Sequence, residues 1–260
     1  MDSMQAIIIA IVEGITEFLP ISSTGHMIIA ERLLGIPSTD FSRTYTVAIQ
    51  LGAILSVVVL YWKKFIDFRR WQFYLKLLIS VIPAIVLGFI FNKKIDALLD
   101  SPLTVAITML AGGVILLFID SIFGKATIHE EEKISYGKAF IIGIWQCIAM
   151  IPGVSRSAAS IVGGMQQKLS RSLAAEFSFF LAVPTMIAAT GYKLLKDYKN
   201  IHVEQIKLLA IGNIVAFVVA VLAIKFFIGF LQKHGFRLFG IYRIVAGIIL
   251  LILILTGYIK

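Results

Sequence analysis

Long apolar runs separated by short polar segments make up most of the 260-residue chain. A helix needs roughly 20 apolar residues to cross about 30 Å of hydrocarbon. Six runs are that long, and they cover residues 44–62, 73–91, 102–121, 172–193, 207–228 and 239–258. Each is predicted to be a helix, because a lone strand would leave its backbone groups unpaired in lipid. The pattern therefore predicts an all-α integral membrane protein.

Two further apolar regions, residues 5–35 and 139–168, are interrupted by polar residues and prolines. The first break contains Glu17 and Pro20, and the second is the stretch PGVSRS (152–157). Each half is too short to cross a bilayer alone, which favours two re-entrant helical hairpins over the alternative of one long kinked helix through each region. Such backbone is stable at membrane depth only where protein buries it or it lines a wet cavity.

The order of one hairpin and three spans occurs twice, which predicts an internal repeat. EGITEFLPISS (13–23) loosely parallels QCIAMIPGVS (146–155) with one gap that aligns Pro20 with Pro152. An odd number of crossings in each half makes the second half inverted relative to the first. The broken helices of such repeats place a functional site near the midplane.

We therefore expect a single membrane domain, residues 1–260, built from two repeats and a loop. The first repeat covers 1–124 and the inverted second repeat covers 138–260. The loop between them, 125–137, is polar, and its run of three glutamates at 130–132 is predicted to be solvated.

Composition agrees with a bilayer environment. Hydrophobic residues make up 59% of the chain and charged residues only 15%, whereas soluble domains carry about 25% charged residues. Lys and Arg lie between the apolar runs, so the net charge of +9 reflects the flanks of membrane spans and excludes a nucleic-acid partner. The single cysteine, Cys147, excludes an internal disulfide, and the N-terminus lacks the basic segment of a signal peptide.

The distribution of Lys and Arg also predicts the orientation, since cytoplasmic loops carry the excess. One side has twelve: Lys63, Lys64, Arg69, Arg70, Lys125, Lys133, Lys138, Lys168, Arg171, Lys225, Lys233 and Arg237. The other side has eight: Arg43, Lys93, Lys94, Lys193, Lys196, Lys199, Lys207 and Lys260. We expect the first side to be cytoplasmic, with both termini and the mouth of the first hairpin outside.

Glu13 and Glu17 are four residues apart and share one helix face. Two carboxylates there repel each other, and each costs several kcal/mol to bury in hydrocarbon. The pair is stable if a cation lies between them, if one is protonated, or if a basic group faces them. A pair of acids reaching out from a helix end is the structural alternative.

Hydroxyls and an imidazole follow the first break. Ser22, Ser23 and Thr24 precede His26, which lies three residues after Ser23. Hydroxyls at this position cap helices, but a helix N-terminus also binds anions. One helical turn is expected to bring His26 beside Ser23 as base and nucleophile, although a single histidine on an apolar face is often structural.

The second break carries Arg156, a permanent cation in a region where charge is expensive. Its guanidinium matches phosphate oxygens, and Gly153 lets the backbone come close. Three hydroxyls flank it, those of Ser155, Ser157 and Ser160. The residues predict a phosphate site, and a structural ion pair with Glu17 is compatible with that role.

The stretches EGITEFLPISSTGH (13–26) and PGVSRSAAS (152–160) together resemble the undecaprenyl-diphosphate phosphatases associated with bacitracin resistance. The resemblance covers essentially the whole chain, including EFSFFLAVPTM (176–186) and YRIVAG (242–247). The family's functional positions fall here on Glu13, Glu17, Ser22, Ser23, His26, Pro152, Gly153, Ser155, Arg156 and Ser157. Ser160 stands where many members carry Thr, which keeps the hydroxyl.

The resemblance implies hydrolysis of undecaprenyl diphosphate to the monophosphate and inorganic phosphate, which recycles the lipid carrier for cell-wall synthesis. It also implies the bacterial plasma membrane, a site that opens to the extracytoplasmic side, and dependence on a divalent cation, Mg²⁺ or Ca²⁺. The oligomeric state, monomer or homo-oligomer, stays open.

Within that reading, Ser23 is the expected nucleophile, His26 its base and Arg156 the group that neutralises the phosphoryl charge. Glu17 is expected to orient or deprotonate the Ser23–His26 pair. Together with Glu13, it is also expected to hold the cation. The expected substrate contacts are Glu13, Ser22, Thr24, Gly153, Ser155, Ser157 and Ser160. A phosphohistidine at His26 or direct attack by water is left open.

A transporter or flippase of polyprenyl phosphate is the alternative function, because secondary transporters also use inverted repeats and broken helices. A paired nucleophile and base is more than transport needs, which favours the enzyme.

Overall fold

The computed structural model describes residues 1–67, 69–99, 101–123, 125–197 and 203–259. Over these residues the chain is helical without strands, as predicted, apart from one isolated bridge between Ile128 and Leu169. The elements in order are α1 (Ser3–Thr16), α2 (Ser23–Leu33), α3 (Asp40–Leu60), α4 (Trp62–Ile66), α5 (Trp71–Leu99), α6 (Pro102–Phe123), η1 (Glu131–Lys133), α7 (Tyr136–Cys147), η2 (Ile148–Met150), α8 (Arg156–Gln166), α9 (Arg171–Asp197), α10 (Val203–His234) and α11 (Arg237–Leu255).

Six helices in the described part of the chain are long and apolar enough to cross a membrane, which confirms the predicted spans. They are α3, α5 over Trp71–Phe91, α6, α9, α10 and α11. Several extend beyond the apolar run, as α10 does over Val203–His234, because hydropathy marks only the lipid-facing length and polar turns continue the helix. Lys199 and Lys260, counted in the orientation, lie outside the described residues, as does the side chain of Lys93.

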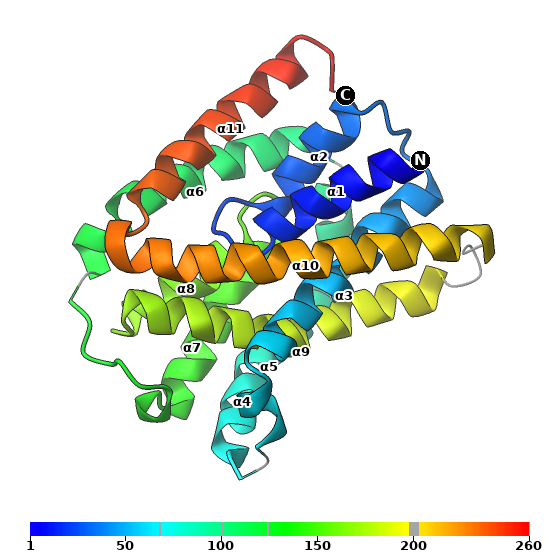
Figure 1. The fold of residues 1–260 in the computed structure, drawn as a ribbon. Coiled ribbons are helices and arrows are strands. Elements are labelled where there is room, and N and C mark those ends of the chain that lie inside the picture. Colours follow the sequence, from blue (N-terminus) through cyan, green and yellow to red (C-terminus); the bar gives the residue numbers. More distant parts are fainter. Residues whose placement is uncertain (68, 100, 124, 198–202, 260) are drawn as a thin grey trace.

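Neither interrupted region forms one continuous helix. Residues 17–22 separate α1 from α2, and residues 151–155 separate the η2 turn from α8. The helices on either side have 11 to 14 residues, which is too short to cross a bilayer. Figure 1 shows α1 and α2 near the two chain ends and α7 and α8 on the opposite side of the molecule.

The short helices pack against long ones. α1 lies along α10, α7 along α5 and α8 along α9, while α6 pairs with α11 (Figure 1). Glycines allow the closest approaches, since a Cβ on Gly52 would overlap the Asn213 carbonyl, and one on Gly143 would overlap that of Ser80. Small residues at helix contacts are typical of membrane proteins, where backbones must approach closely to gain dispersion energy.

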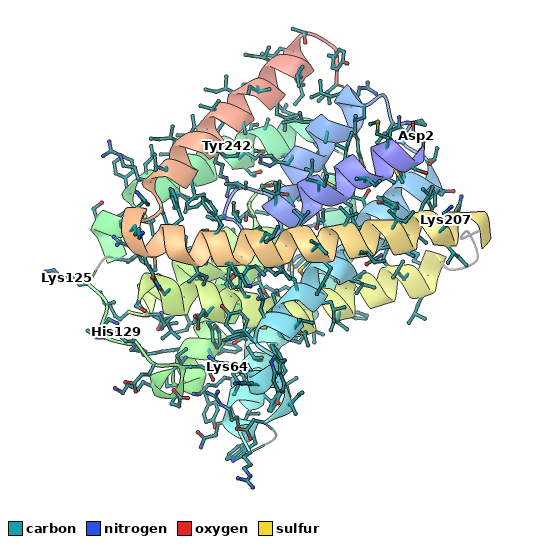
Figure 2. All side chains as sticks on the ribbon, viewed as in Figure 1. Asp2, Lys64, Lys125, His129, Lys207 and Tyr242 are labelled. Carbon is teal, nitrogen blue, oxygen red and sulfur yellow. The ribbon has the colours of Figure 1, made fainter. Side chains whose placement is uncertain are left out.

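The connecting segment corrects one expectation, because Glu131 is buried rather than solvated. Its side chain is 4% exposed and accepts from Lys64 Nζ at 2.8 Å and Arg70 Nη2 at 3.3 Å. Lys76, also buried, donates to the carbonyls of Glu131 and Glu132 at 3.0 and 3.1 Å. The loop is therefore bound to the region of α4 and α5 (Lys64 and His129 are labelled in Figure 2). The local sequence of the loop does not show that these basic residues lie beside it.

We expect Glu131→Gln to lower stability by roughly 2 kcal/mol, or about 4–8 °C, because two cations lose a buried carboxylate. The matched control is Glu130→Gln, since Glu130 is 61% exposed and pairs with an equally exposed Lys133. Exposed pairs contribute little. Thermal unfolding in detergent measures both, and equal midpoints for the two variants would contradict the network's role.

Candidate functional site

The two breaks meet, and an ion pair joins them. Arg156 Nη2 donates to Glu17 Oε1 at 3.0 Å across 139 residues of sequence. Ser157 Oγ donates to the Leu19 carbonyl at 2.8 Å. The Arg156 and Glu17 side chains are 13% and 6% exposed, so water screens their attraction weakly. These contacts show that the two breaks lie side by side in the fold.

A serine cap in the same unusual conformation begins the helix after each break. Ser22 has φ 73° and accepts from the Gly25 N–H at 3.4 Å. Ser155 has φ 74° and accepts from the Ala158 N–H at 3.3 Å. Positive φ is costly for a residue with a Cβ, so tertiary contacts hold both serines in place. After the second cap, Arg156 and Ser157 reach across to the first break; after the first cap, Ser23 turns back to Glu17 of its own break.

Arg156 is oriented by α9 as well as by Glu17. Its Nη1 donates to the Ser178 carbonyl at 3.0 Å, and its guanidinium lies 5.6 Å from the centre of the Phe18 ring. Ser178 Oγ is also 2.7 Å from Ser160 Oγ. The Nε–H of Arg156 has no partner among the described residues although it is buried. The fork is thus rigidly held and keeps one donor free for an anion.

Glu13 lies one helical turn before Glu17 and is 1% exposed. Both of its carboxylate oxygens lack a hydrogen-bond partner in the part of the chain that the structure describes. A buried carboxylate without a partner is expensive. These two oxygens therefore mark a place for a proton or a cation beside the Glu17–Arg156 pair.

Contrary to the prediction, no hydrogen bond joins Ser23 and His26. Ser23 Oγ instead donates to Glu17 Oε2 at 2.8 Å. His26 Nδ1 lies 2.7 Å from the Ser22 carbonyl, and Nε2 lies 2.9 Å from Tyr242 Oη. Because a carbonyl only accepts, Nδ1 carries the proton and Nε2 accepts from the tyrosine.

This difference has a local cause. The Ser22 carbonyl, at the start of α2, also accepts from the His26 backbone N–H. This carbonyl therefore holds the imidazole away from the Ser23 hydroxyl. The ring stacks on Tyr242 of α11, at 5.5 Å between centroids (Tyr242 is labelled in Figure 2). Glu17, not His26, is therefore the group within reach of the Ser23 proton.

The remaining predicted residues line or support the breaks. Thr24 lies half-buried in the first turn of α2. Gly153 has φ 85°, and a Cβ there would overlap Thr108 Oγ1 and the Val105 carbonyl. Ser155 Oγ is 3.0 Å from Ser157 Oγ, and Ser160 Oγ donates to the Arg156 carbonyl at 2.8 Å. Ser157 and Ser160 are buried, and their hydroxyls donate to backbone carbonyls.

Three residues at the site were not singled out from sequence: Ser178, Tyr242 and Arg243. Arg243 is fully buried and reaches both breaks. An arginine inside the apolar run 239–258 is a signal that could have identified it, because charge within a span is costly. Ser178 and Tyr242 lie in stretches that carry the family resemblance, but a hydroxyl within a helix gives no physical signal of its own.

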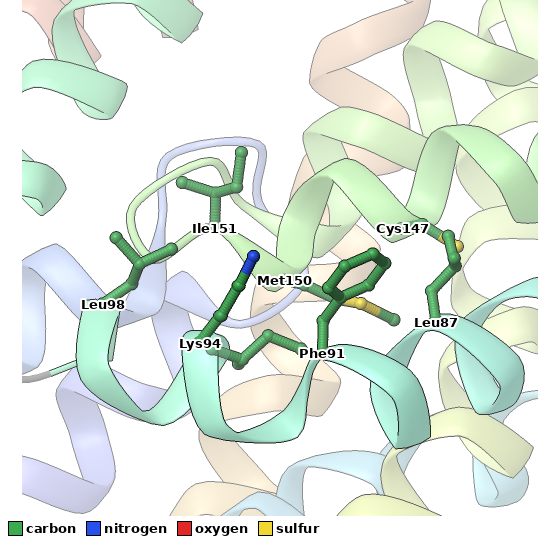
Figure 3. Close-up of a pocket in the computed structure, with 8 residues that line it drawn as sticks. Leu87, Phe91, Lys94, Leu98, Cys147, Met150 and Ile151 are labelled. Atoms are coloured by element: carbon green, nitrogen blue, oxygen red, sulfur yellow. The ribbon is translucent and has the colours of Figure 1, made fainter.

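An apolar groove of about 250 Å³ lies beside the second break, between α5 and the end of α7 (Figure 3). Its charged lining residue is Lys94, and Ile151 of the second break also lines it. The other lining residues are Leu87, Phe91, Ile95, Leu98, Cys147 and Met150.

Fold and site together define a class: a multi-pass helical membrane protein in which two interrupted helices enclose carboxylates, an arginine and hydroxyls. Residues 6–249 match the family model described as bacitracin resistance protein BacA, and the chain belongs to this family.

Similar proteins match nearly the whole chain. An undecaprenyl-diphosphatase of Flavobacterium psychrophilum is 63% identical over 256 residues, which is 97% of this chain and 96% of that protein. One of Flavobacterium johnsoniae is 59% identical, with the same coverage. One of Aquifex aeolicus is 44% identical over 96% of this chain and 97% of that protein.

The cap geometry generates a stability prediction. Both Ser155→Ala and Ser155→Gly remove the cap, but only glycine also removes the cost of positive φ. The glycine variant should therefore be more stable than the alanine variant by about 1 kcal/mol or more. Ser170 is the control, since it caps the Leu173 N–H and is not among the positive-φ residues. Unfolding curves in detergent measure the difference in stability between the glycine and alanine variants at each position. If this difference is no larger at Ser155 than at Ser170, the prediction is wrong.

Proposed function

We propose that the chain hydrolyses undecaprenyl diphosphate to undecaprenyl phosphate and inorganic phosphate, which returns the lipid carrier to peptidoglycan synthesis. The observation that carries the proposal is the position of Glu17 between Ser23 Oγ, at 2.8 Å, and Arg156, at 3.0 Å. An acid, a hydroxyl and a cation at these distances suit phosphoryl transfer. Transport does not require a hydroxyl with its own base, and the similar proteins are named as phosphatases.

In the proposed reaction Ser23 Oγ attacks the terminal phosphorus while its proton passes to Glu17 Oε2. The anhydride P–O bond breaks, and undecaprenyl phosphate leaves with the electron pair. Water then attacks the phosphoserine, and the Ser23 Oγ–P bond breaks. Glu17 returns its proton to the departing Ser23 Oγ and takes one from the attacking water, so that inorganic phosphate and the free serine result. Loss of that proton to solvent regenerates the Glu17 carboxylate. Arg156 neutralises the charge that develops on the transferring group, which is the main electrostatic contribution to such reactions.

A divalent cation, Mg²⁺ or Ca²⁺, fits the acidic side of the site. The two unpartnered oxygens of Glu13 and the neighbouring Glu17 are hard ligands of the kind these ions prefer. No group of three His, Cys, Asp or Glu residues that could hold a metal occurs among the described residues. A Mg²⁺ site of one or two carboxylates completed by substrate phosphate oxygens is common, and the ion would supply charge neutralisation there.

The proposal includes two inverted repeats with re-entrant hairpins, and the helix contacts support it. α1 packs on α10 as α7 packs on α5, and α3 contacts α10 as α9 contacts α5. The caps Ser22 and Ser155 then occupy equivalent positions, and this pairing needs no gap, so Pro20 corresponds to Gly153 rather than to Pro152.

We propose that the protein lies in the bacterial plasma membrane, as the resemblance to its family implies. The Lys and Arg distribution supports a site that opens to the extracytoplasmic side. The segment 125–135 is then cytoplasmic. Labelling of a single cysteine in that segment by an impermeant reagent on intact cells would contradict this orientation.

Phosphate release from undecaprenyl diphosphate by the purified protein tests the function. We expect Glu17→Gln and Ser23→Ala to lower kcat at least about 100-fold, because base and nucleophile act together. Glu31→Gln is the matched control, since Glu31 bonds Thr46 away from the site, and it should stay within twofold. Trapped phosphoenzyme should map to Ser23; phosphate on His26 would exclude the serine mechanism, and inactive wild-type protein would exclude the function.

Cation binding can be measured apart from activity. Mg²⁺ or Ca²⁺ should raise the melting temperature of the wild-type protein, because a ligand that binds the folded state stabilises it. Glu13→Gln should abolish most of this increase, whereas Glu31→Gln should keep it. An equal increase in Glu13→Gln would show that the ion binds elsewhere.

A further inference from the structure

Arg243 is a buried cation outside both breaks, on α11. Its side chain is fully buried, and every hydrogen bond recorded for it in the described residues goes to a backbone carbonyl. Nε donates to Met109 O at 3.0 Å, and Nη2 donates to Thr108 O at 3.1 Å. These two bonds fasten the guanidinium to α6.

The same guanidinium also reaches the two breaks. Nη1 donates to the Pro20 carbonyl at 3.4 Å, and Nη2 donates to the Gly153 carbonyl at 2.5 Å. Pro20 and Gly153 each lie two residues before a strained serine cap. One side chain therefore bonds equivalent positions on segments that are 133 residues apart in the repeat pairing.

The surroundings are shaped for this fork. A Cβ on Gly112 would come within 2.5 Å of Arg243 Nη2 and 2.6 Å of Cζ. Thr108 Oγ1 donates to the Pro152 carbonyl at 2.6 Å, so α6 holds the second break next to the arginine. Larger residues at Gly112 would displace the guanidinium from the carbonyls.

Carbonyls in the breaks have no helical partners, and lipid offers them none. A planar guanidinium with five donors can bond several of them at once, whereas an ammonium is a single point. Without a bound metal ion, Glu13, Glu17 and Arg156 together carry one net negative charge when ionised. The charge of Arg243 offsets it in that state.

We infer that Arg243 is a positioning residue for the reaction: it fixes the separation of the two breaks and so the geometry of Ser23, Glu17 and Arg156. The inference rests on the proposed phosphatase function. Because aligned reacting groups matter most in the transition state, a loosened separation should lower kcat more than it raises KM.

The test compares Arg243→Lys, which keeps the charge, and Gly112→Ala, which keeps the arginine, with the control Gly247→Ala. Gly247 lies on the same α6–α11 contact, but its added Cβ would meet mainly the flexible side chain of Leu110 at 3.0 Å. We expect kcat to fall at least about 30-fold in Arg243→Lys and tenfold in Gly112→Ala, with KM within threefold. Gly247→Ala should keep kcat and KM within twofold of the wild-type values.

A second readout is independent of activity. Spin labels at Thr24 and Ile151, in a Cys147→Ser background, report the separation of the breaks by electron paramagnetic resonance. The distance distribution should be broader in Gly112→Ala and in Arg243→Lys than in Gly247→Ala. Should Arg243→Lys fail to fold, the two glycine variants decide.

Unchanged kcat and an unchanged distance distribution in Gly112→Ala would overturn the role of Arg243. Inactive wild-type protein would overturn the proposed function instead, while the distance measurement would still decide whether Arg243 sets the separation.

Discussion

Hydrocarbon offers the backbone no hydrogen bonds, and the two interruptions at 17–22 and 151–155 must therefore find their partners inside the protein. The structure meets this constraint with side chains. Ser22 and Ser155 cap the helices that follow, Ser157 bonds a carbonyl of the opposite break, and Arg243 bonds both breaks to α6. These bonds supply partners to the irregular backbone from which the polar side chains project.

The chemistry depends on the same arrangement. Glu17 accepts from Ser23 on one oxygen and from Arg156 on the other. In the proposed reaction it is therefore both the base for the hydroxyl and the partner that orients the cation. In a site shielded from water these attractions are stronger than they are at a protein surface. A lipid with a charged head group is a substrate that requires such a site within the apolar region.

Hydropathy and helix-breaking residues predicted the six spans, both interruptions and most of the polar residues at the site. These features are local, because span length and the cost of a charge in lipid are readable from one segment at a time. The prediction was wrong for Glu131, which is buried against Lys64 and Arg70. The expected Ser23–His26 pair does not form. Spacing along a helix shows which residues are close, but it does not show the direction in which a helix cap turns each side chain.

By itself, the sequence determined that the chain lies in a membrane, where its helices are interrupted, and that acids, hydroxyls and an arginine occupy the interruptions. It also carried the motifs of the family to which the chain belongs. The tertiary structure decided which of these groups contact one another: Ser23 with Glu17, His26 with Tyr242, and both breaks with Arg243. The physical reason is that these contacts join segments up to 223 residues apart, whose relative positions are set by helix packing and by the bonds that buried carbonyls require.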